Sequence, residues 1–273
     1  MSYKEKDSAP PTSKVDGSQS IRRAISIIRA VSKYNESGVR LTQVAKDVSL
    51  HVATARRILH VLNQEGLIGY DQSSKHYYLG IELFSLGTAA NQFEIRTTYR
   101  PALERIAEQT KETVFLNIRM GNNSLCIDRI EGSAPIRIMP YPVGTQTPLG
   151  VGSGELALIF NLPDKEIEQI LSANEKRYRQ YNAGDKSIIW QAVIEARKLK
   201  FSISRGLYIK GVGGVGWPIM SAVGQETIAA ISVVTLSEKL DMDQCKRFAS
   251  IIRHEVEALV NIVAADPASS KST

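Results

Sequence analysis

Residues 51–57, with the sequence HVATARR, bring together side chains that can hydrogen-bond to a nucleic acid. Arginine donates to guanine edges and to phosphate, and threonine reaches either kind of group. Helical spacing of about 100° per residue puts Ala53, Thr54 and Arg57 on one face, with Arg56 on its flank. We therefore predict that Thr54 and Arg57 enter a DNA groove, that the small Ala53 permits close approach, and that Arg56 contacts phosphate.

The opposite face of this segment is apolar and needs a core to pack on. Its apolar positions are spaced three or four residues apart: Val52, Ala55, Leu59 and Leu62. The residues of the polar face also have alternative roles that do not involve DNA. Thr54 could instead cap the helix, Arg57 could be a solvated surface charge, and His51 could either touch the groove or lie at the surface.

Two more helices and a hairpin would position this segment. Residues 20–31 predict a helix behind an N-cap candidate, Ser20, and residues 41–48 predict a short second helix that Thr42 could cap. The apolar stripe of the first helix is Ile21, Ala24, Ile28 and Val31. After Gly66, residues 67–71 and 76–80 are strand-like around a QSSK turn. This order indicates an N-terminal winged helix-turn-helix over residues 20–80, mostly helical with a small β wing.

The positive charge lies in the same segment. The chain has a formal net charge of +6, and residues 20–80 hold nine basic and four acidic side chains, so +5 of the excess lies there. Such an asymmetry is typical of proteins that bind polyanions. Chance clustering on a solvated face is the alternative.

The combination resembles the N-terminal half of IclR-type transcriptional regulators. The family pattern is present in LTQVA (41–45), TARRIL (54–59), the helix exit from Leu62 to Gly66, and YLG (78–80). Thr54 and Arg57 match the family's recognition-helix Thr and Arg, whereas Ala53 stands where a Ser is common. The resemblance and the helical spacing together give this set of DNA-binding candidates: Arg22, Arg23, Thr42, His51, Ala53, Thr54, Arg56 and Arg57. Of these, we expect Arg22 and Arg23 to contact phosphate rather than bases.

The larger, C-terminal part alternates helices and strands. Residues 81–98 predict a helix, which the resemblance implies is a linker that helps to pair subunits, and Pro101 predicts the first turn of a new helix. The expected strands are residues 114–120, 125–132, 136–139 and 227–236, and a closing helix covers 241–265. We expect an α+β effector-binding domain over residues 99–265, GAF-like by resemblance.

A glycine-rich segment, PLGVGSG (148–154), precedes a predicted helix over residues 155–160. Backbone N–H groups that converge at a helix start suit a carboxylate or another small anion, although a tight connection with no ligand is the alternative. In the family the pattern P-L-x-x-[SA]-x-x-G-K-A lines the effector pocket. Glu155 and Leu156 replace its Gly-Lys, which is a clear departure.

The expected effector-binding residues are Gly152, Ser153, Gly154, Arg205, Gly213, Gly214 and Ser232. Arg205 could pair with an anionic effector or be a surface charge. Residues 211–216 formally match G-x-G-x-x-G, but Trp217 and Pro218 follow, so no helix can start there to receive a pyrophosphate. We therefore reject dinucleotide binding.

The sequence contains few residues that indicate an enzyme or a metal site. Two cysteines and four scattered histidines cannot make a disulfide framework or a four-ligand metal site. Cys126, in an apolar run, is expected to be a plain buried thiol. The larger part has no histidine before His254 and no nucleophile elbow. We expect no catalytic residue, no metal and no cofactor.

These observations predict a regulator that binds a double-stranded, inverted-repeat DNA operator as a homodimer or homotetramer. Its effector would be a small, carboxylate-bearing metabolite. The departures at Glu155, Leu156, Gly206, Leu207 and Gly214 keep open a sensor that has drifted and lost its ligand; a metabolite-processing enzyme is a distant alternative.

Localisation and the termini follow from composition. No apolar run reaches the roughly 18–20 residues that span a bilayer, and the N-terminus lacks the apolar region of a secretory signal. We expect a cytoplasmic protein without a membrane partner. Residues 1–19 and 266–273 are expected to be disordered tails.

Overall fold

The computed structural model describes residues 17–88, 92–136, 138, 141–221 and 226–265. The chain divides into two compact units at Phe93/Glu94, and each unit has a hydrophobic core of its own. The expected tails lie outside the described residues, except that residues 17–19 belong to the first helix.

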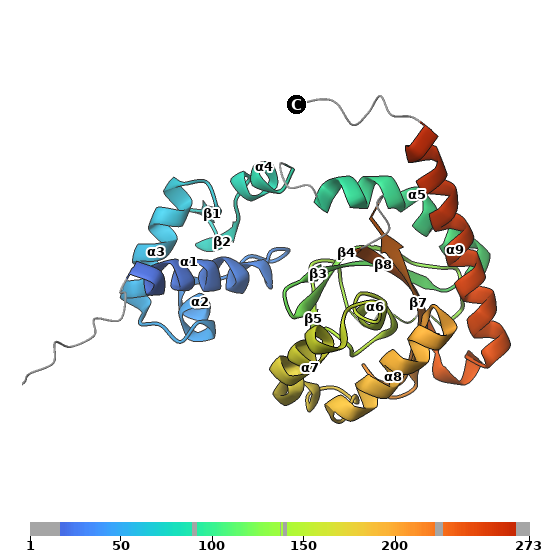
Figure 1. The fold of residues 1–273 in the computed structure, drawn as a ribbon. Helices are drawn as coiled ribbons and strands as arrows, with labels where there is room; N and C mark the ends of the chain where they lie inside the picture. Colours follow the sequence, from blue (N-terminus) through green and yellow to red (C-terminus); the bar gives the residue numbers. More distant parts are fainter. Residues whose placement is uncertain (1–16, 89–91, 137, 139–140, 222–225, 266–273) are drawn as a thin grey trace, which may run out of the picture. The chain divides into compact units, whose positions relative to one another are not determined.

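The first unit has the predicted helix-turn-helix and wing. Helices α1 (Gly17–Ser32), α2 (Leu41–Asp47) and α3 (Val52–Gln64) are followed by the antiparallel strands β1 (Ile68–Asp71) and β2 (His76–Leu79) (Figure 1). Val39 adds a bridge to Tyr77 beside the hairpin. The core of this unit includes Ile27, Val31 and Leu59.

Two expected core residues are exposed. Ile21 is 63% exposed and Val52 is 46% exposed. Both lie in the first turns of their helices, beyond the end of the stripe that the neighbouring helices cover. In α1 the buried residues are Ile27, Ala30 and Val31, and the predicted Ala24 and Ile28 pack against the same core, so only Ile21 departs from the stripe predicted for this helix. Ser20 lies inside α1 and Thr42 inside α2, whose N-cap is Arg40, so neither residue caps its helix.

Two glycines let the wing close on the recognition helix. α3 ends before Gly66, which has a φ of +68°, and Gly80 passes directly over the Gly66 backbone. A Cβ at Gly80 would lie against the Gly66 carbonyl oxygen and 2.8 Å from the Leu67 carbonyl carbon. Gly80 N–H also donates to Leu67 O at 2.9 Å. The helix exit from Leu62 to Gly66 and the YLG motif (78–80) therefore meet at one backbone crossing.

The helices around residues 81–110 begin and end at other residues than expected. Helix α4 covers Glu82–Thr88, and α5 runs over Gln92–Thr110 with Pro101 in its interior rather than in its first turn. A new helix therefore does not begin at Pro101. The single linker helix expected over residues 81–98 corresponds to α4 and the first part of α5, with residues 89–91 outside the described chain.

The second unit is built on one antiparallel, six-stranded sheet in the order β5-β4-β3-β8-β7-β6. Its strands are β3 (Thr113–Met120), β4 (Asn123–Ile130), β5 (Gln146–Pro148), β6 (Ser202–Arg205), β7 (Val212–Met220) and β8 (Thr227–Leu236). The strands expected at residues 114–120 and 125–132 are present as β3 and β4, which pair as an antiparallel hairpin. The strand expected at 136–139 is not present: Ile136 and Ile138 lie in no strand, and residues 137 and 139 are outside the described residues. The strand that pairs with the outer edge of β4 is instead β5.

Helices cover both faces of this sheet (Figure 1). On one face, α5 and α9 (Met242–Ala265) bury Leu103, Ile106, Phe248 and Ile252. On the other lie α6 (Ser153–Ala157), α7 (Asp164–Tyr178) and α8 (Lys186–Leu199), and a 3-10 turn, η1 (Ser237–Lys239), follows β8. This arrangement confirms the predicted α+β class.

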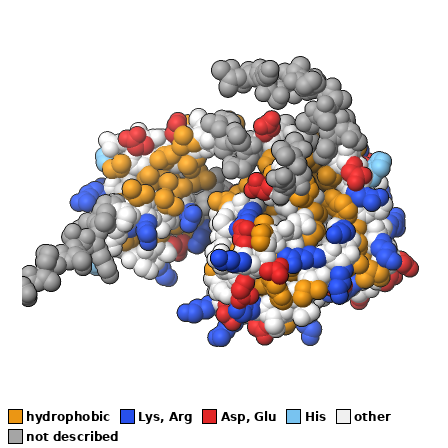
Figure 2. Space-filling model, in the orientation of Figure 1, with side chains coloured by type: hydrophobic (Ala, Val, Ile, Leu, Met, Phe, Trp, Pro, Cys, Tyr) orange, Lys and Arg blue, Asp and Glu red, His pale blue; other side chains and the backbone are white. Residues whose placement is uncertain are grey.

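Figure 2 shows Lys, Arg, Asp and Glu side chains interspersed over the visible face of the larger unit. Among the described residues no helix is long and apolar enough to cross a membrane.

Candidate functional sites

Helix α3 presents a polar face opposite a buried stripe. Ala55, Leu59 and Leu62 are buried, whereas Ala53, Arg56 and Arg57 are exposed and Thr54 is half-buried. The N-cap of α3 is His51, in extended conformation, and Thr54 is the third helical residue, so the N-cap reading of Thr54 is wrong. The helix therefore carries an unobstructed patch at its N-terminal end, where a recognition helix contacts base edges.

The other DNA-binding candidates lie on the neighbouring helices. Thr42 is exposed at the start of α2, and His51 is exposed immediately before α3. On α1, Arg22 is exposed and Arg23 is half-buried. All eight candidates thus belong to α1, α2 or the start of α3, and none is fully buried.

A groove between α2, α3 and the wing adds residues that sequence reasoning missed. Arg40, Arg56 and Lys75 line it from three different elements, together with Thr42 and Tyr70. Three positive side chains around one groove can contact successive phosphates of a DNA strand. Arg40 and Lys75 could have been noticed as basic residues, but only the fold places them beside Arg56.

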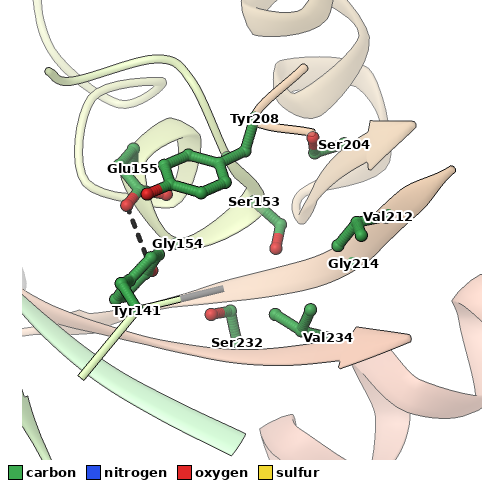
Figure 3. Close-up of a pocket in the computed structure, with 12 residues that line it drawn as sticks. Tyr141, Ser153, Gly154, Glu155, Ser204, Tyr208, Val212, Gly214, Ser232 and Val234 are labelled. Carbon is green, nitrogen blue, oxygen red and sulfur yellow. Dashed lines mark hydrogen bonds between the residues drawn. The ribbon is translucent and has the colours of Figure 1, made fainter. Parts of the chain in front are cut away.

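The larger unit contains a pocket on the α6 side of the sheet (Figure 3). Its lining residues are Tyr141, Gly152, Ser153, Gly154, Glu155, Ser204, Tyr208, Val212, Gly213, Gly214, Ser232 and Val234. Six of the seven effector-binding candidates are among them. They come from α6, β7 and β8, which are far apart in the chain.

Arg205, the seventh candidate, does not line this pocket. Its guanidinium lies near the Leu240 carbonyl, with Nε to O at 3.4 Å, and 3.9 Å from a Glu195 carboxylate oxygen on α8. β6 directs it away from the pocket, toward Cys245 of α9, because side chains alternate along a strand and the neighbouring Ser204 faces the pocket.

Glu155 occupies the start of the α6 helix, where an anionic ligand was expected. It is 2% exposed, and its Oε1 accepts hydrogen bonds from Thr147 Oγ1 at 2.7 Å and from the Tyr141 hydroxyl at 3.2 Å. Its carboxyl also accepts from its own backbone N–H, and a Cβ at Gly152 would collide with Oε2. Burial raises the pKa of this carboxyl above its ordinary value.

Aromatic rings close the pocket beside Glu155. Tyr208 packs edge-on against Tyr141 with ring centroids 5.4 Å apart, and Tyr181 and Phe115 extend the cluster. Burial, together with the nearby Glu155 carboxylate, raises the pKa of Tyr141 well above its usual value. The cavity that remains has a volume of about 20 Å³, room for roughly one water molecule.

Glycines allow the strands to approach α6. A Cβ at Gly214 would lie 2.6 Å from Ser153 Oγ and 2.6 Å from the Val233 carbonyl oxygen, so only glycine fits there. The G-x-G-x-x-G match lies largely within strand β7, which continues to Met220, so no helix starts at the position where a pyrophosphate would need one.

Both cysteines of the chain, Cys126 and Cys245, are free and buried, as predicted for Cys126. Burial raises the pKa of the Cys126 thiol to about 12. Within the described ranges no cluster of His, Cys, Asp or Glu could hold a metal ion.

Comparison with known proteins agrees with both units. Residues 20–72 match the IclR helix-turn-helix domain, and residues 87–261 match the bacterial transcriptional regulator IclR C-terminal domain. The transcriptional repressors AllR of Klebsiella pneumoniae and of Escherichia coli K12 are each 24% identical over 239 residues, covering 87% of both chains.

Solved structures share the fold. An IclR transcriptional regulator from Alicyclobacillus acidocaldarius superposes with a TM-score of 0.73 at 20% identity, over 89% of this chain and 98% of that one. An IclR homologue from Microbacterium hydrocarbonoxydans, complexed with 4-hydroxybenzoate, gives a TM-score of 0.76 at 17% identity, over 90% and 99%. Since the C-terminal match alone covers more than half of its residues, the chain belongs to the IclR family of transcriptional regulators.

Proposed function

We propose that this transcriptional regulator binds an inverted-repeat DNA operator as a dimer, or as a pair of dimers, and that a small metabolite in the larger unit controls the binding. The family consists of transcriptional regulators and not of enzymes. The observation that carries the proposal is the exposed face of α3, with Ala53, Thr54 and Arg57 opposite a buried stripe. Access to DNA puts its site of action in the cytoplasm.

The residues divide between base and phosphate contacts. Thr54 and Arg57 lie where α3 would enter the major groove, and Arg57 can make the bidentate contact that distinguishes guanine. Arg22, Arg23 and the groove residues Arg40, Arg56 and Lys75 would hold the phosphate backbone. His51 and Thr42 flank the same surface.

Dimer formation is supported by exposed apolar side chains around α4. Ile81, Phe84 and Leu86 are 77%, 66% and 57% exposed, which is unusual for large apolar residues on one short segment. A second copy of this segment would cover them, as expected for a linker helix that pairs subunits. Two recognition helices in one dimer favour an operator with two half-sites.

The metabolite site proposed here is the pocket lined by Gly152, Ser153, Gly154, Gly214 and Ser232. A ligand there would act only through its different affinity for the DNA-binding and non-binding arrangements of the dimer. The small volume of the cavity favours the second candidate, a sensor that has lost its ligand. Screening small metabolites by thermal shift distinguishes the two, since a drifted sensor gains no stability from any of them.

Operator selection from random DNA, followed by footprinting, tests the DNA-binding proposal. We expect two protected half-sites, and we expect Arg57→Ala to lose the selected site while Arg179→Ala keeps it. Arg179 is an exposed arginine at the end of α7 and serves as the matched charge control. Protection of a single half-site by a monomer would refute the dimeric operator.

A further inference from the structure

The effector pocket contains a carboxyl group, that of Glu155, with no cationic partner among the described residues. Its twelve lining residues include no Lys, Arg or His. Both side-chain donors to Glu155, Thr147 and Tyr141, are neutral hydroxyls, and both bind Oε1 rather than Oε2. A buried carboxylate without a cation is costly to hold, which agrees with the raised pKa of Glu155.

A second acceptor lies beneath the same wall. Asn117 is fully buried at the irregularity between β3 and β4, and its Nδ2 donates to Ser124 Oγ at 2.9 Å. Among the described residues its Oδ1 has no hydrogen-bond partner. Asn117 packs directly behind Gly154, which lines the pocket: a Cβ at Gly154 would lie 3.3 Å from Asn117 Oδ1 and 3.1 Å from Ser232 Oγ.

The side chains that line the pocket offer hydroxyls and one carboxyl but no cation. Glu155 accepts, while the hydroxyls of Tyr141, Tyr208, Ser153, Ser204 and Ser232 can either donate or accept (Figure 3). The start of α6, which could otherwise have bound an anion, already receives the Glu155 carboxyl. A ligand carboxylate would lie beside the Glu155 carboxyl, and none of the described residues that line the pocket carries a positive charge to stabilise the pair.

We propose that the effector of this regulator presents N–H donors to Glu155, as an amidinium, guanidinium, amide or ureide group does, and that Glu155 excludes carboxylates. This inference rests on the proposed metabolite response of the larger unit. The proposal differs from the carboxylate-bearing effector expected from the glycine-rich motif, because Glu155 already places a carboxyl group at the start of α6.

Entry of such a ligand requires Tyr208 to move. Its ring lies beside Glu155 over the pocket, and the cavity holds only about one water molecule while the ring is in place (Figure 3). Tyr208 lies between Gly206 and Gly211, whose φ angles of +86° and +82° mark the two ends of a turn between β6 and β7. Rotation of this one side chain would open the pocket without disturbing the sheet.

Isosteric probes test the chemical class. Acetamidine, acetamide and acetate, and benzamidine, benzamide and benzoate, would be titrated into the full chain and followed by thermal shift and calorimetry. We expect stabilisation by at least one amidine or amide and none by its carboxylate partner. The amidines and amides should bind Glu155→Gln at least about tenfold more weakly, which corresponds to the loss of one charge-assisted hydrogen bond. Glu175→Gln, at an exposed position of α7, is the control and should leave their affinity unchanged.

The ligand-free protein provides a second measurement. If Glu155 is held for a ligand rather than for the fold, Glu155→Gln raises the melting temperature at pH 7.5, because it removes a buried charge and keeps an acceptor for Thr147 and Tyr141. A lower melting temperature would show a structural carboxyl and overturn the proposal. Stabilisation by the carboxylate probes, or by no probe, would overturn it as well. Operator binding by the same preparations is measured separately, so failure of the DNA-binding function would be recognised as such.

Discussion

Gly80→Ala tests the backbone crossing that joins the wing to the recognition helix. The new Cβ would lie against the Gly66 carbonyl oxygen, 2.7 Å from the Gly66 carbonyl carbon and 2.8 Å from that of Leu67. Carbon atoms pack best at about 3.5–4.0 Å, so the two backbones must separate by about 1 Å. All three contacting atoms belong to the backbone, so no flexible side chain can turn away to relieve the clash.

The expected cost follows from these contacts. Overpacking of this kind costs about 1–3 kcal/mol, and loss of the Gly80 N–H to Leu67 O hydrogen bond adds about 1 kcal/mol. We therefore expect the first unit to lose about 3 kcal/mol of unfolding free energy. For a domain of this size that corresponds to a melting temperature lower by more than about 10 °C.

Tryptophan placement allows the effect to be assigned to one unit. The chain has two tryptophans, Trp190 on α8 and Trp217 on β7, and both belong to the larger unit. Gly80→Ala should shift part of the helical circular-dichroism transition to lower temperature while the tryptophan fluorescence transition stays in place. It should also abolish operator binding at the temperature where the first unit has melted.

Gly69→Ala is the matched control. Gly69 lies in β1 of the same wing, and a Cβ there would meet nothing within 4 Å. Equal behaviour of the two variants would refute the close-crossing argument. A shift of the fluorescence transition in Gly80→Ala would refute the assignment to the first unit.

Four further outcomes follow from the sites. Arg57→Ala should cost about 1–3 kcal/mol of binding to the selected operator and relax its base preference in gel-shift competition, and an unchanged footprint would contradict this. Arg22→Ala should weaken binding to all sequences alike and lower the salt slope by about 1, whereas a sequence-selective loss would argue for base contact. The pKa of Glu155 is raised in the folded state, so the folded protein keeps the Glu155 proton to higher pH than the unfolded chain does. The free energy of unfolding should therefore fall as the pH rises from the ordinary pKa of a glutamate through the pKa of Glu155 in the folded protein. Glu155→Gln should flatten this part of the pH profile in urea titrations, and parallel profiles of the two proteins would contradict this. Cys126, buried with a pKa of about 12, should resist a thiol reagent at pH 8 until the protein unfolds, and rapid labelling of the native chain would show an accessible thiol.

The first unit was largely predictable from local sequence. Ala55, Leu59 and Leu62 recur at helical spacing, and this period alone leaves Ala53 and Arg57 on the opposite face. The glycine that ends α3 and the strand-like segments of the wing are likewise local signals. The exposed Ile21 and Val52 were not predictable, because the sequence gives the phase of an apolar stripe but not how far the neighbouring helices extend along it.

The pocket was predictable in part. Gly152, Ser153, Gly154, Gly213, Gly214 and Ser232 all line it, since the family motif marks the glycines that let α6 approach the sheet. Tyr141 and Tyr208 were missed, because an aromatic residue carries no local sign of facing a cavity. Arg205 was included because it lies near the others in sequence, although strand alternation turns it away.

By itself the sequence determined the family, the two-part organisation, the polar face of α3 and the concentration of positive charge in residues 20–80. All of these depend on residue type and on spacings of a few residues, which the chain carries wherever it folds. Only the tertiary structure decided which carboxyl fills the start of α6, which tyrosine covers it, and which basic residues meet at the groove. Those features depend on strands and helices distant in sequence coming into contact. Burial, and with it the raised pKa of Glu155, exists only once they have packed.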